Sequence, residues 1–206
     1  WIKFSGKEIQ EITTLQFQDW TNKSAQDITP IEHLVMNPSA DAKMKIIEFA
    51  DFLCIHCKNA FPKLHTFAKA HPDVQFSFQS FPLDGACNSA IGYSEGTRCY
   101  LAKLSLCVGR QDPEKGWKTQ EWIFANQRDL TNMESVKTNM KPQIASLGLD
   151  EEKLQQCLGD QETHKIITEQ AKLGENVGVK GTPTIFINGK KLQGVSLPVL
   201  DKIYKE

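Results

Sequence analysis

The chain has 206 residues, of which 40% are hydrophobic and 24% are charged, and its formal net charge is −1. This composition is that of a globular protein with a core, and the absence of a Lys/Arg cluster argues against nucleic acid as the main partner. No apolar run approaches the roughly 18 residues that a membrane-spanning helix needs. The first residue is Trp1 rather than Met, so we expect a processed or trimmed product.

The first third of the chain predicts a polar N-terminal segment followed by a strand–helix–strand unit. In the N-terminal segment, the spacing of apolar residues favours a helix over Ser5–Asn22 and a short strand over His33–Met36. Met44–Ala50 is a short apolar run with one charge, which is typical of a buried strand. Ile55–Ala70 has helical spacing, and Val74–Phe81 alternates as a strand does. These last three segments predict a βαβ unit.

The middle of the chain, residues 84–175, predicts a helical block. Five successive segments have helix-like apolar spacing, and three glycines stand where C-terminal helix caps belong. The segments are Ser94–Gly109, Gly116–Leu130, Met133–Leu147, Asp150–Leu158 and Gln161–Leu173, and the glycines are Gly148, Gly159 and Gly174.

The C-terminal segment returns to strand patterns. Thr184–Ile187 is β-branched and aromatic, and Asn188–Gly189 after it is a strong hairpin signal. Lys190–Gln193 is the expected return strand, and Leu197–Tyr204 can close the chain as a helix. The order of elements therefore predicts an α/β protein whose sheet is interrupted by a helical insertion.

Cys54-Ile55-His56-Cys57 lies between the first buried strand and its helix. A cysteine at the first turn of a helix faces unpaired N–H groups and the positive end of the helix dipole, which favour the reactive thiolate. Two intervening residues leave the sulfurs within disulfide reach, and the His56 ring could stabilise the Cys54 anion. The rival interpretation is half of a zinc site, but no second CxxC or suitably spaced histidine pair is present. We therefore predict a redox pair and no metal.

Gly181-Thr182-Pro183-Thr184 stands directly before the hairpin strand. Taken alone, Pro183 could be an ordinary loop proline at a strand's first residue. A strand–CxxC–helix unit followed late in the chain by this motif and an Asn-Gly hairpin resembles the thioredoxin superfamily. The resemblance implies that Pro183 is cis and packs beside the redox pair. It also implies that the backbone at Thr182 pairs with a substrate strand.

The resemblance implies an α/β, thioredoxin-like fold with an inserted helical domain. We expect an N-terminal extension with a short helix over residues 1–40. Residues 41–83 and 176–206 would form the thioredoxin-like domain, and residues 84–175 the insert.

Further segments resemble the DsbA-like thiol oxidases. Glu48 stands six residues before Cys54 and matches a buried acid of that family, which implies proton exchange with Cys57. A solvated strand charge is the alternative. Other matching segments are Phe81–Asp84, Cys87-Asn88, Cys99, Gly116-Trp117, Trp122–Gln127, Cys157-Leu158 and Gly178–Pro183. They resemble a bacterial subgroup that includes periplasmic domains fused to a vitamin K epoxide reductase homologue. The common Pro-His dipeptide of the CxxC motif is Ile-His here.

Six cysteines, an even number, favour an oxidising compartment in which the four outside the motif pair as structural disulfides. Four cysteines allow three connectivities, and we prefer Cys87 with Cys99, which leaves Cys107 with Cys157. Buried free thiols in a cytosolic protein, or a second pair that relays electrons to Cys54 and Cys57, are the alternatives.

These observations predict a periplasmic or otherwise extracytoplasmic thiol–disulfide oxidoreductase that donates the Cys54–Cys57 disulfide to cysteine-containing proteins. Cys54 and Cys57 are the catalytic sulfurs, His56 and Glu48 assist them, and Thr182 and Pro183 bind substrate. We expect no cofactor, no nucleic acid and a monomer. A quinone-linked membrane partner, such as a vitamin K epoxide reductase-like domain, would reset the pair. A disulfide isomerase or reductase that uses the same residues, or a non-catalytic thioredoxin-like chaperone or binding module, are the alternatives.

Overall fold

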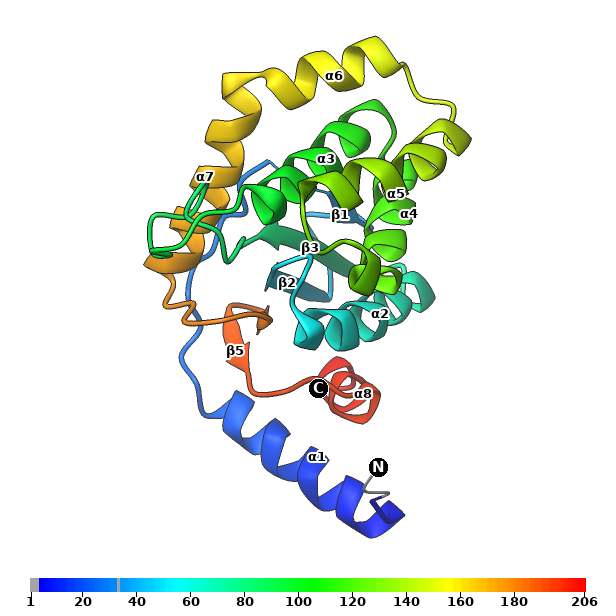
Figure 1. The fold of residues 1–206 in the computed structure, drawn as a ribbon. Coiled ribbons are helices and arrows are strands. Elements are labelled where there is room, and N and C mark those ends of the chain that lie inside the picture. The colour runs from blue at the N-terminus through cyan, green and yellow to red at the C-terminus, as the bar shows by residue number, and fades with distance from the viewer. Residues whose placement is uncertain (1–3, 33) are drawn as a thin grey trace.

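A computed structural model describes residues 4–32 and 34–206 of the chain (Figure 1). Helix α1 (Gly6–Thr21) begins at Ser5, whose side chain accepts a hydrogen bond from the backbone N–H of Glu8 in a capping box. The N-terminal segment then continues to strand β1 (Val35–Met36). The predicted helix and short strand are confirmed, except that His33 lies outside the described residues.

The centre of the molecule is a five-stranded sheet with the order β1-β3-β2-β4-β5. Strands β2 (Met44–Ala50) and β3 (Val74–Ser80) are parallel and joined by helix α2 (Ile55–Ala70). Strand β4 (Thr184–Ile187) pairs antiparallel with β2 and turns into β5 (Lys190–Leu192). The chain therefore leaves the sheet after β3 and returns to it at β4, beside the strand that leads into the CxxC motif.

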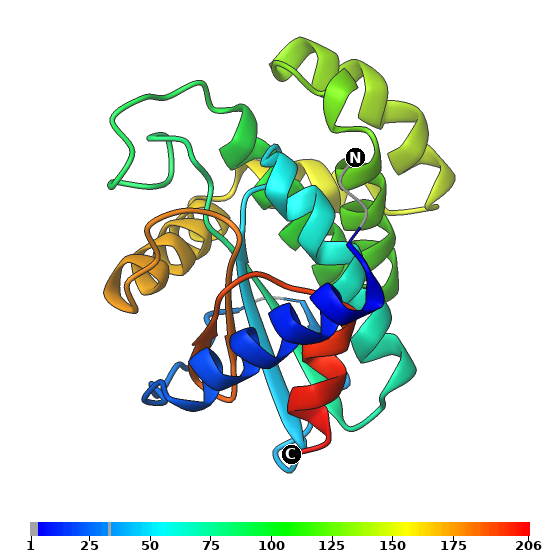
Figure 2. The ribbon, with the colours of Figure 1, turned by 90° about the horizontal axis from the view of Figure 1, so that it is seen from below.

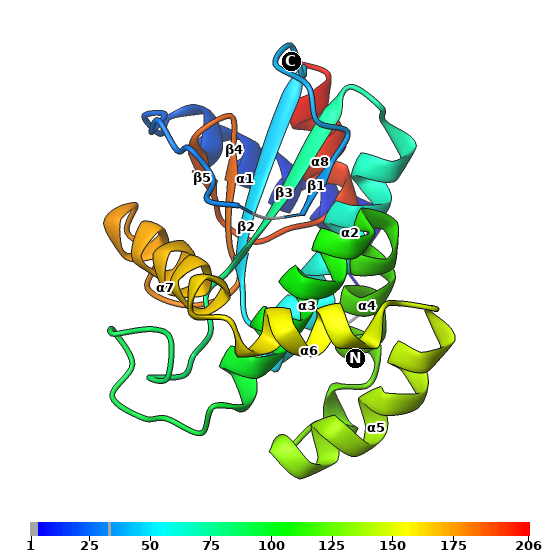
Figure 3. The same ribbon diagram turned by 90° about the horizontal axis from the view of Figure 1, so that it is seen from above.

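Five α-helices lie between β3 and β4 in the chain, gathered mainly above the sheet in Figure 1 and beside it in Figure 3. The predicted helix over Gly116–Leu130 instead begins at Pro113, capped by the Asp112 side chain, and gives way to a short 3-10 turn, η1 (Gln127–Asp129). The fold class is confirmed, and the grouping of these helices into a separate inserted domain stays a prediction. The helices are α3 (Thr97–Gln111), α4 (Pro113–Ala125), α5 (Met133–Ser146), α6 (Glu151–Gly159) and α7 (Gln161–Asn176).

The two faces of β2 belong to different hydrophobic clusters. Ile46 and Ala50 join the large core that also contains Phe61 of α2, whereas Ile47 and Phe49 pack in a second cluster with residues of α7. Alternation along the strand places Glu48 on the same face as Ile46 and Ala50, toward α2. On the side seen in Figure 2, helix α1 lies beside the C-terminal helix α8 (Leu197–Tyr204). No helix among the described residues has the length and apolarity of a membrane span.

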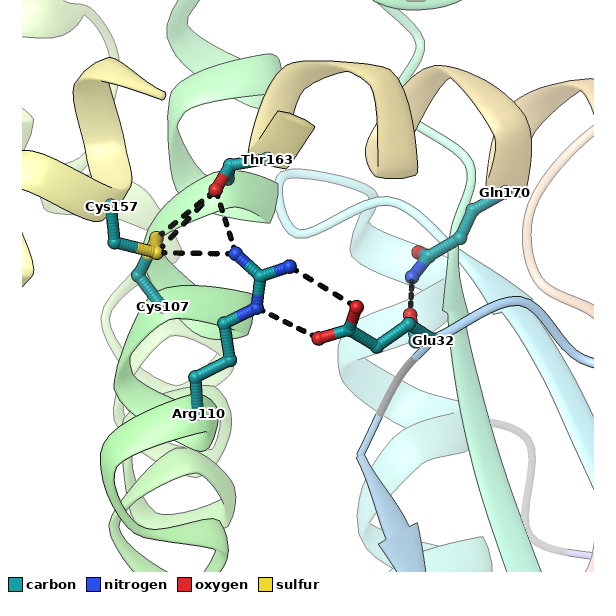
Figure 4. Close-up of polar contacts among 6 residues, drawn as sticks. All are labelled: Glu32, Cys107, Arg110, Cys157, Thr163 and Gln170. Carbon is teal, nitrogen blue, oxygen red and sulfur yellow. Dashed lines mark hydrogen bonds and ion pairs between the residues drawn. A yellow bond between two sulfur atoms is a disulfide. The ribbon is translucent and has the colours of Figure 1, made fainter. Parts of the chain in front are cut away.

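A disulfide joins Cys107 of α3 to Cys157 of α6, 50 positions apart (Figure 4). Closing a loop of this length lowers the conformational entropy of the unfolded chain. In the chain-entropy model this stabilises the folded state by about 4 kcal/mol. The Arg110 guanidinium lies 3.7 Å from Cys157 Sγ, donates to Thr163 Oγ1 over 2.9 Å, and pairs with the Glu32 carboxylate over 2.7 Å. The disulfide joins α3 to α6, and Arg110 joins α3 to α7 and to the N-terminal segment that precedes β1.

The other predicted disulfide does not form in the structure, where Cys87 and Cys99 are free thiols joined by a side-chain hydrogen bond. The segment that carries Cys87 is already held by the Asp84 carboxylate, which accepts the backbone N–H groups of Ala86 and Glu95 over 3.0 and 3.3 Å. Both thiols are buried, at 3% and 4% exposure, which disfavours the alternative of an electron relay.

Candidate active site

The two cysteines of the motif sit at the start of α2, directly beyond the carboxyl end of β2. Cys54 is the N-cap residue, with extended backbone angles of φ −79° and ψ 122°, and Cys57 lies in the first helical turn. The Cys54 N–H donates to the Asp51 carbonyl over 3.1 Å, and the Cys54 carbonyl accepts the first hydrogen bond of α2, from Lys58 N. Cys54 thus stands at the end of the helix where the N–H groups of the first turn have no helical partner, although its side chain accepts no capping hydrogen bond from them.

The two sulfurs have opposite acidities. A hydrogen bond from the Cys57 thiol, together with the backbone N–H groups of Cys57 and His56, lowers the pKa of Cys54 to about 5. Burial, the neighbouring Cys54 and the Glu48 carboxylate raise the pKa of Cys57, which is 0% exposed. At neutral pH the half-buried Cys54 is therefore a thiolate, while Cys57 holds its proton.

Residues from the end of the chain complete the site. The Cys54 Sγ lies 3.3 Å from the carbonyl oxygen of Thr182, and the Thr182–Pro183 peptide bond is cis. The antiparallel pairing of β4 with β2 creates this contact, because it brings the residues before Thr184 to the strand end from which Cys54 emerges. Thr182 and Pro183 are half-buried, so a partner chain can approach the edge beside the reactive sulfur.

Glu48 is fully buried on β2, under the start of α2. Both carboxylate oxygens have no hydrogen-bond partner among the described residues. Burial, and next the charge of Cys54, raise the pKa of Glu48 well above its ordinary value. Of the two sequence interpretations, the solvated strand charge is wrong, because the residue is 0% exposed. A carboxyl group that keeps its proton to a higher pH than usual can donate that proton to a neighbouring sulfur.

The structure gives no contact between the His56 ring and the Cys54 sulfur among the described residues. Its side chain is exposed, and the interaction that the structure gives for His56 at the sulfur is through its backbone N–H. A catalytic role for the ring therefore stays a prediction.

Asp51 fixes the segment before Cys54, and sequence reasoning gave it no role. Its carboxylate accepts the backbone N–H groups of Leu53 and Leu83, each over 2.7 Å, and forms an ion pair with Arg98 of α3. The Asp51 side chain is 0% exposed, and burial raises its pKa although the Arg98 charge opposes this. Breaking a buried pair of this kind typically costs about 3–5 kcal/mol. Its position three residues before a CxxC motif was the signal that could have indicated it.

The short turn η1, which follows α4, holds the same segment from another side. The Gln127 side-chain amide donates to the Phe52 carbonyl over 2.7 Å and to the Cys54 carbonyl over 3.0 Å. In the sequence, Gln127 stood out as part of a resembling segment and carried no assigned function. No group of three or more His, Cys, Asp or Glu side chains with metal-binding geometry occurs within residues 4–32 and 34–206.

Comparison with known proteins agrees with this geometry. A family model described as "Thioredoxin" matches residues 36–203. Disulfide bond formation protein D of Bacillus subtilis is 27% identical over 159 residues, which are 74% of this chain and 67% of that protein. The crystal structure of Pseudomonas aeruginosa DsbA2 is similar with a TM-score of 0.64 and 26% identity, covering 87% of this chain and 98% of that one. The Na(+)/H(+) antiporter NhaA 3 of Salinispora tropica is 22% identical over 75% of this chain, but over only 21% of its own length.

Proposed function

The chain belongs to the thioredoxin family as a DsbA-like thiol–disulfide oxidoreductase, and from this we propose that it donates a Cys54–Cys57 disulfide to cysteine-containing proteins outside the cytoplasm. The observation that carries the proposal is the placement of the Cys54 sulfur. It sits at the N-cap of α2 with a pKa lowered to about 5, and it lies 3.3 Å from the Thr182 carbonyl. A pair whose reduced form is stabilised in this way gives up its disulfide readily.

The proposed reaction has two exchange steps. A substrate thiolate attacks the Cys54 sulfur of the oxidised pair, the Cys54–Cys57 bond breaks, and Cys57 leaves with the electron pair. A second substrate thiolate then attacks the substrate sulfur of this mixed disulfide and releases Cys54 as a thiolate. The substrate loses two electrons in forming its disulfide, and the Cys54–Cys57 pair gains them.

The acidities of the buried groups suit the first step. Cys57 is a poor leaving group as an anion, because burial raises its pKa. Glu48 keeps its proton to a higher pH than an ordinary carboxyl group, so in our proposal it protonates the departing Cys57 sulfur.

Substrate binding is assigned to the exposed edge around the Cys54 sulfur. We propose that an extended substrate segment hydrogen-bonds to the backbone at Thr182 and lies along Pro183. Ile55, which is 56% exposed directly after Cys54, offers an apolar contact for an unfolded chain. Such binding depends on the backbone and on apolar side chains of the substrate and not on one sequence. It therefore favours a broad range of cysteine-containing substrates.

An oxidising compartment is proposed because the chain carries the Cys107–Cys157 disulfide, a bond that persists outside the reducing cytosol. After each cycle the reduced pair needs an oxidant. We propose a quinone-linked membrane partner, such as a vitamin K epoxide reductase-like domain, for that role.

One observation favours the alternative of a disulfide isomerase. Helix α1 exposes Ile9, Ile12 and Leu15, at 42%, 40% and 66%, and a dimer could cover this face. Isomerisation needs the reduced pair, because only the Cys54 thiolate can attack a wrong disulfide. The equilibrium redox state of the pair therefore separates the two activities.

The test is a titration of the pair in glutathione buffers, read by alkylation and mass, together with the oligomeric state in solution. We expect a monomer whose reduction potential is closer to about −120 mV than to about −270 mV, the values of a strong oxidant and of thioredoxin. A reducing pair in a dimer that rescues scrambled disulfides would replace the oxidase assignment with the isomerase. No exchange with any disulfide would leave the binding-module alternative.

A further inference from the structure

We propose that Gln127 is a positioning residue for the redox pair. In this inference, which rests on the proposed function, the amide of Gln127 holds the Cys54 peptide in the orientation that lets helix N–H groups reach the sulfur. Gln127 does not touch the reacting atoms, so its effect passes through the backbone of the CxxC segment.

The contacts of Gln127 are directed at the residues around the sulfur. Its Nε2 donates to the carbonyls of Phe52 and Cys54, over 2.7 and 3.0 Å, and these two carbonyls flank Leu53. An amide –NH₂ group has two protons, and both have an acceptor here. The partners lie 75 and 73 positions away in sequence, so this is a tertiary link and not a local turn.

A second bond runs in the opposite direction, from α2 to the last residue of α4, two positions before Gln127. The Lys58 ammonium, in the first turn of α2, donates to the Ala125 carbonyl at the end of α4 over 2.9 Å. The segment from the end of α4 into η1 and the segment around the start of α2 are thus joined by a donor from each side. This reciprocal link fixes the distance between the helical block and the CxxC segment.

The peptide that Gln127 holds also starts helix α2. The Cys54 carbonyl accepts Lys58 N as the first hydrogen bond of the helix, and the Cys54 N–H is bound to the Asp51 carbonyl. With both ends of the residue held, the Cys54 side chain stays near the backbone N–H groups of His56 and Cys57. Loss of the Gln127 bonds leaves the Cys54 carbonyl with the Lys58 N–H as its remaining donor and frees the Phe52 carbonyl, so the Cys54 peptide is held less firmly and the sulfur spends less time near the His56 and Cys57 N–H groups.

The experiment compares Gln127→Met with Gln111→Met, two substitutions that keep side-chain length and remove the amide. Gln111 is a matched control in the same helical block. It is also half-buried, and it donates to a backbone carbonyl, that of Asp150, over 3.0 Å. Each variant loses two hydrogen bonds to backbone groups, which for Gln111 are one to the Asp150 carbonyl and one from the Asp150 N–H, but only Gln127→Met loses them at the CxxC segment.

The readout is the ultraviolet absorbance of the Cys54 thiolate as a function of pH in the reduced protein. We expect Gln127→Met to raise the Cys54 pKa by roughly half a unit to one unit, the scale of one lost hydrogen bond to a charged state. The reduction potential should fall with it. Gln111→Met should leave both unchanged. An unchanged pKa and potential in Gln127→Met, or equal shifts in the two variants, would overturn the proposal.

This readout needs no substrate. If the wild-type protein has a lowered Cys54 pKa but exchanges no disulfide, the proposed function fails while the role of Gln127 can still be measured. If exchange is normal and Gln127→Met changes neither quantity, the positioning role fails alone.

Discussion

Substitution of Cys54 by serine is expected to abolish thiol–disulfide exchange, with a loss of at least roughly a thousandfold against a model disulfide. Serine keeps the shape of the side chain, but its hydroxyl is not ionised at neutral pH and is a poor nucleophile toward sulfur. The activity depends on the Cys54 thiolate, which the first turn of α2 stabilises. The measurement is the exchange rate with a fluorescent disulfide peptide, with far-ultraviolet circular dichroism as the check of folding.

Two further cysteine variants sharpen this test. Cys57→Ser should still react with a substrate disulfide, but it should stop at the mixed disulfide, since no second sulfur remains to resolve it. Cys99→Ser, which changes a buried thiol outside the pair, should retain exchange. Undiminished exchange in Cys54→Ser would reject Cys54 as the nucleophile. An adduct on Cys57 in place of Cys54 would reverse the two roles.

The second large effect is expected at Glu48. Replacing this acid by glutamine removes a titratable proton beside Cys57, so the leaving sulfur of the first exchange step is no longer protonated. General acid catalysis commonly contributes about a hundredfold or more, and we expect substrate oxidation to slow by at least about tenfold. Rapid mixing of the oxidised protein with a dithiol peptide measures this step. In the wild type, the rate of substrate oxidation should change with pH as Glu48 titrates. This part of the pH dependence should be absent in Glu48→Gln.

The same substitution has an effect on stability whose sign follows from linkage. Burial raises the folded-state pKa of Glu48 above its unfolded value, so the proton is held more tightly in the folded protein. The wild-type free energy of unfolding is therefore highest below the unfolded pKa and falls as pH rises toward the folded pKa, by up to about 1.4 kcal/mol per pH unit. Glu48→Gln should match the wild type near pH 4 and exceed it at neutral pH.

Denaturant unfolding at a series of pH values checks this prediction, with Ser77→Ala as a control for a change at another fully buried polar residue, on β3. Parallel pH profiles of wild type and Glu48→Gln would show that Glu48 is ionised in the folded protein. The proton-donor role would then be lost as well, because an ionised carboxylate has no proton to give.

The sequence predicted those parts of the fold that local pattern encodes. The apolar run Met44–Ala50, the CxxC motif and the helical spacing after it were enough to place Cys54 at a helix start. Gly148 follows α5 with φ +59°, as its predicted cap position requires. Gly174 was wrongly predicted as a cap: it lies inside α7, where a Cβ would meet the Phe81 ring at 2.5 Å, so its role is close packing.

The residues that support the site were harder to predict, because their partners are distant in sequence. Asp51 gains its importance from Leu83 and Arg98, and Gln127 from Phe52 and Cys54, and no periodicity reports such pairs. The burial of Glu48 was equally hidden, since a single charge in an apolar strand reads the same whether it faces solvent or the core. The reactive cysteines could thus be recognised from the local sequence, whereas the residues that hold them in place, Asp51 and Gln127, were found only in the tertiary structure.

The most direct test of Cys54 as the reactive thiolate is its titration in the reduced wild-type protein, followed by ultraviolet absorbance with Cys54→Ser as the blank. We expect a transition with a midpoint near pH 5 that is missing from the blank. A midpoint close to about 8.5, the value of an ordinary cysteine, would contradict it.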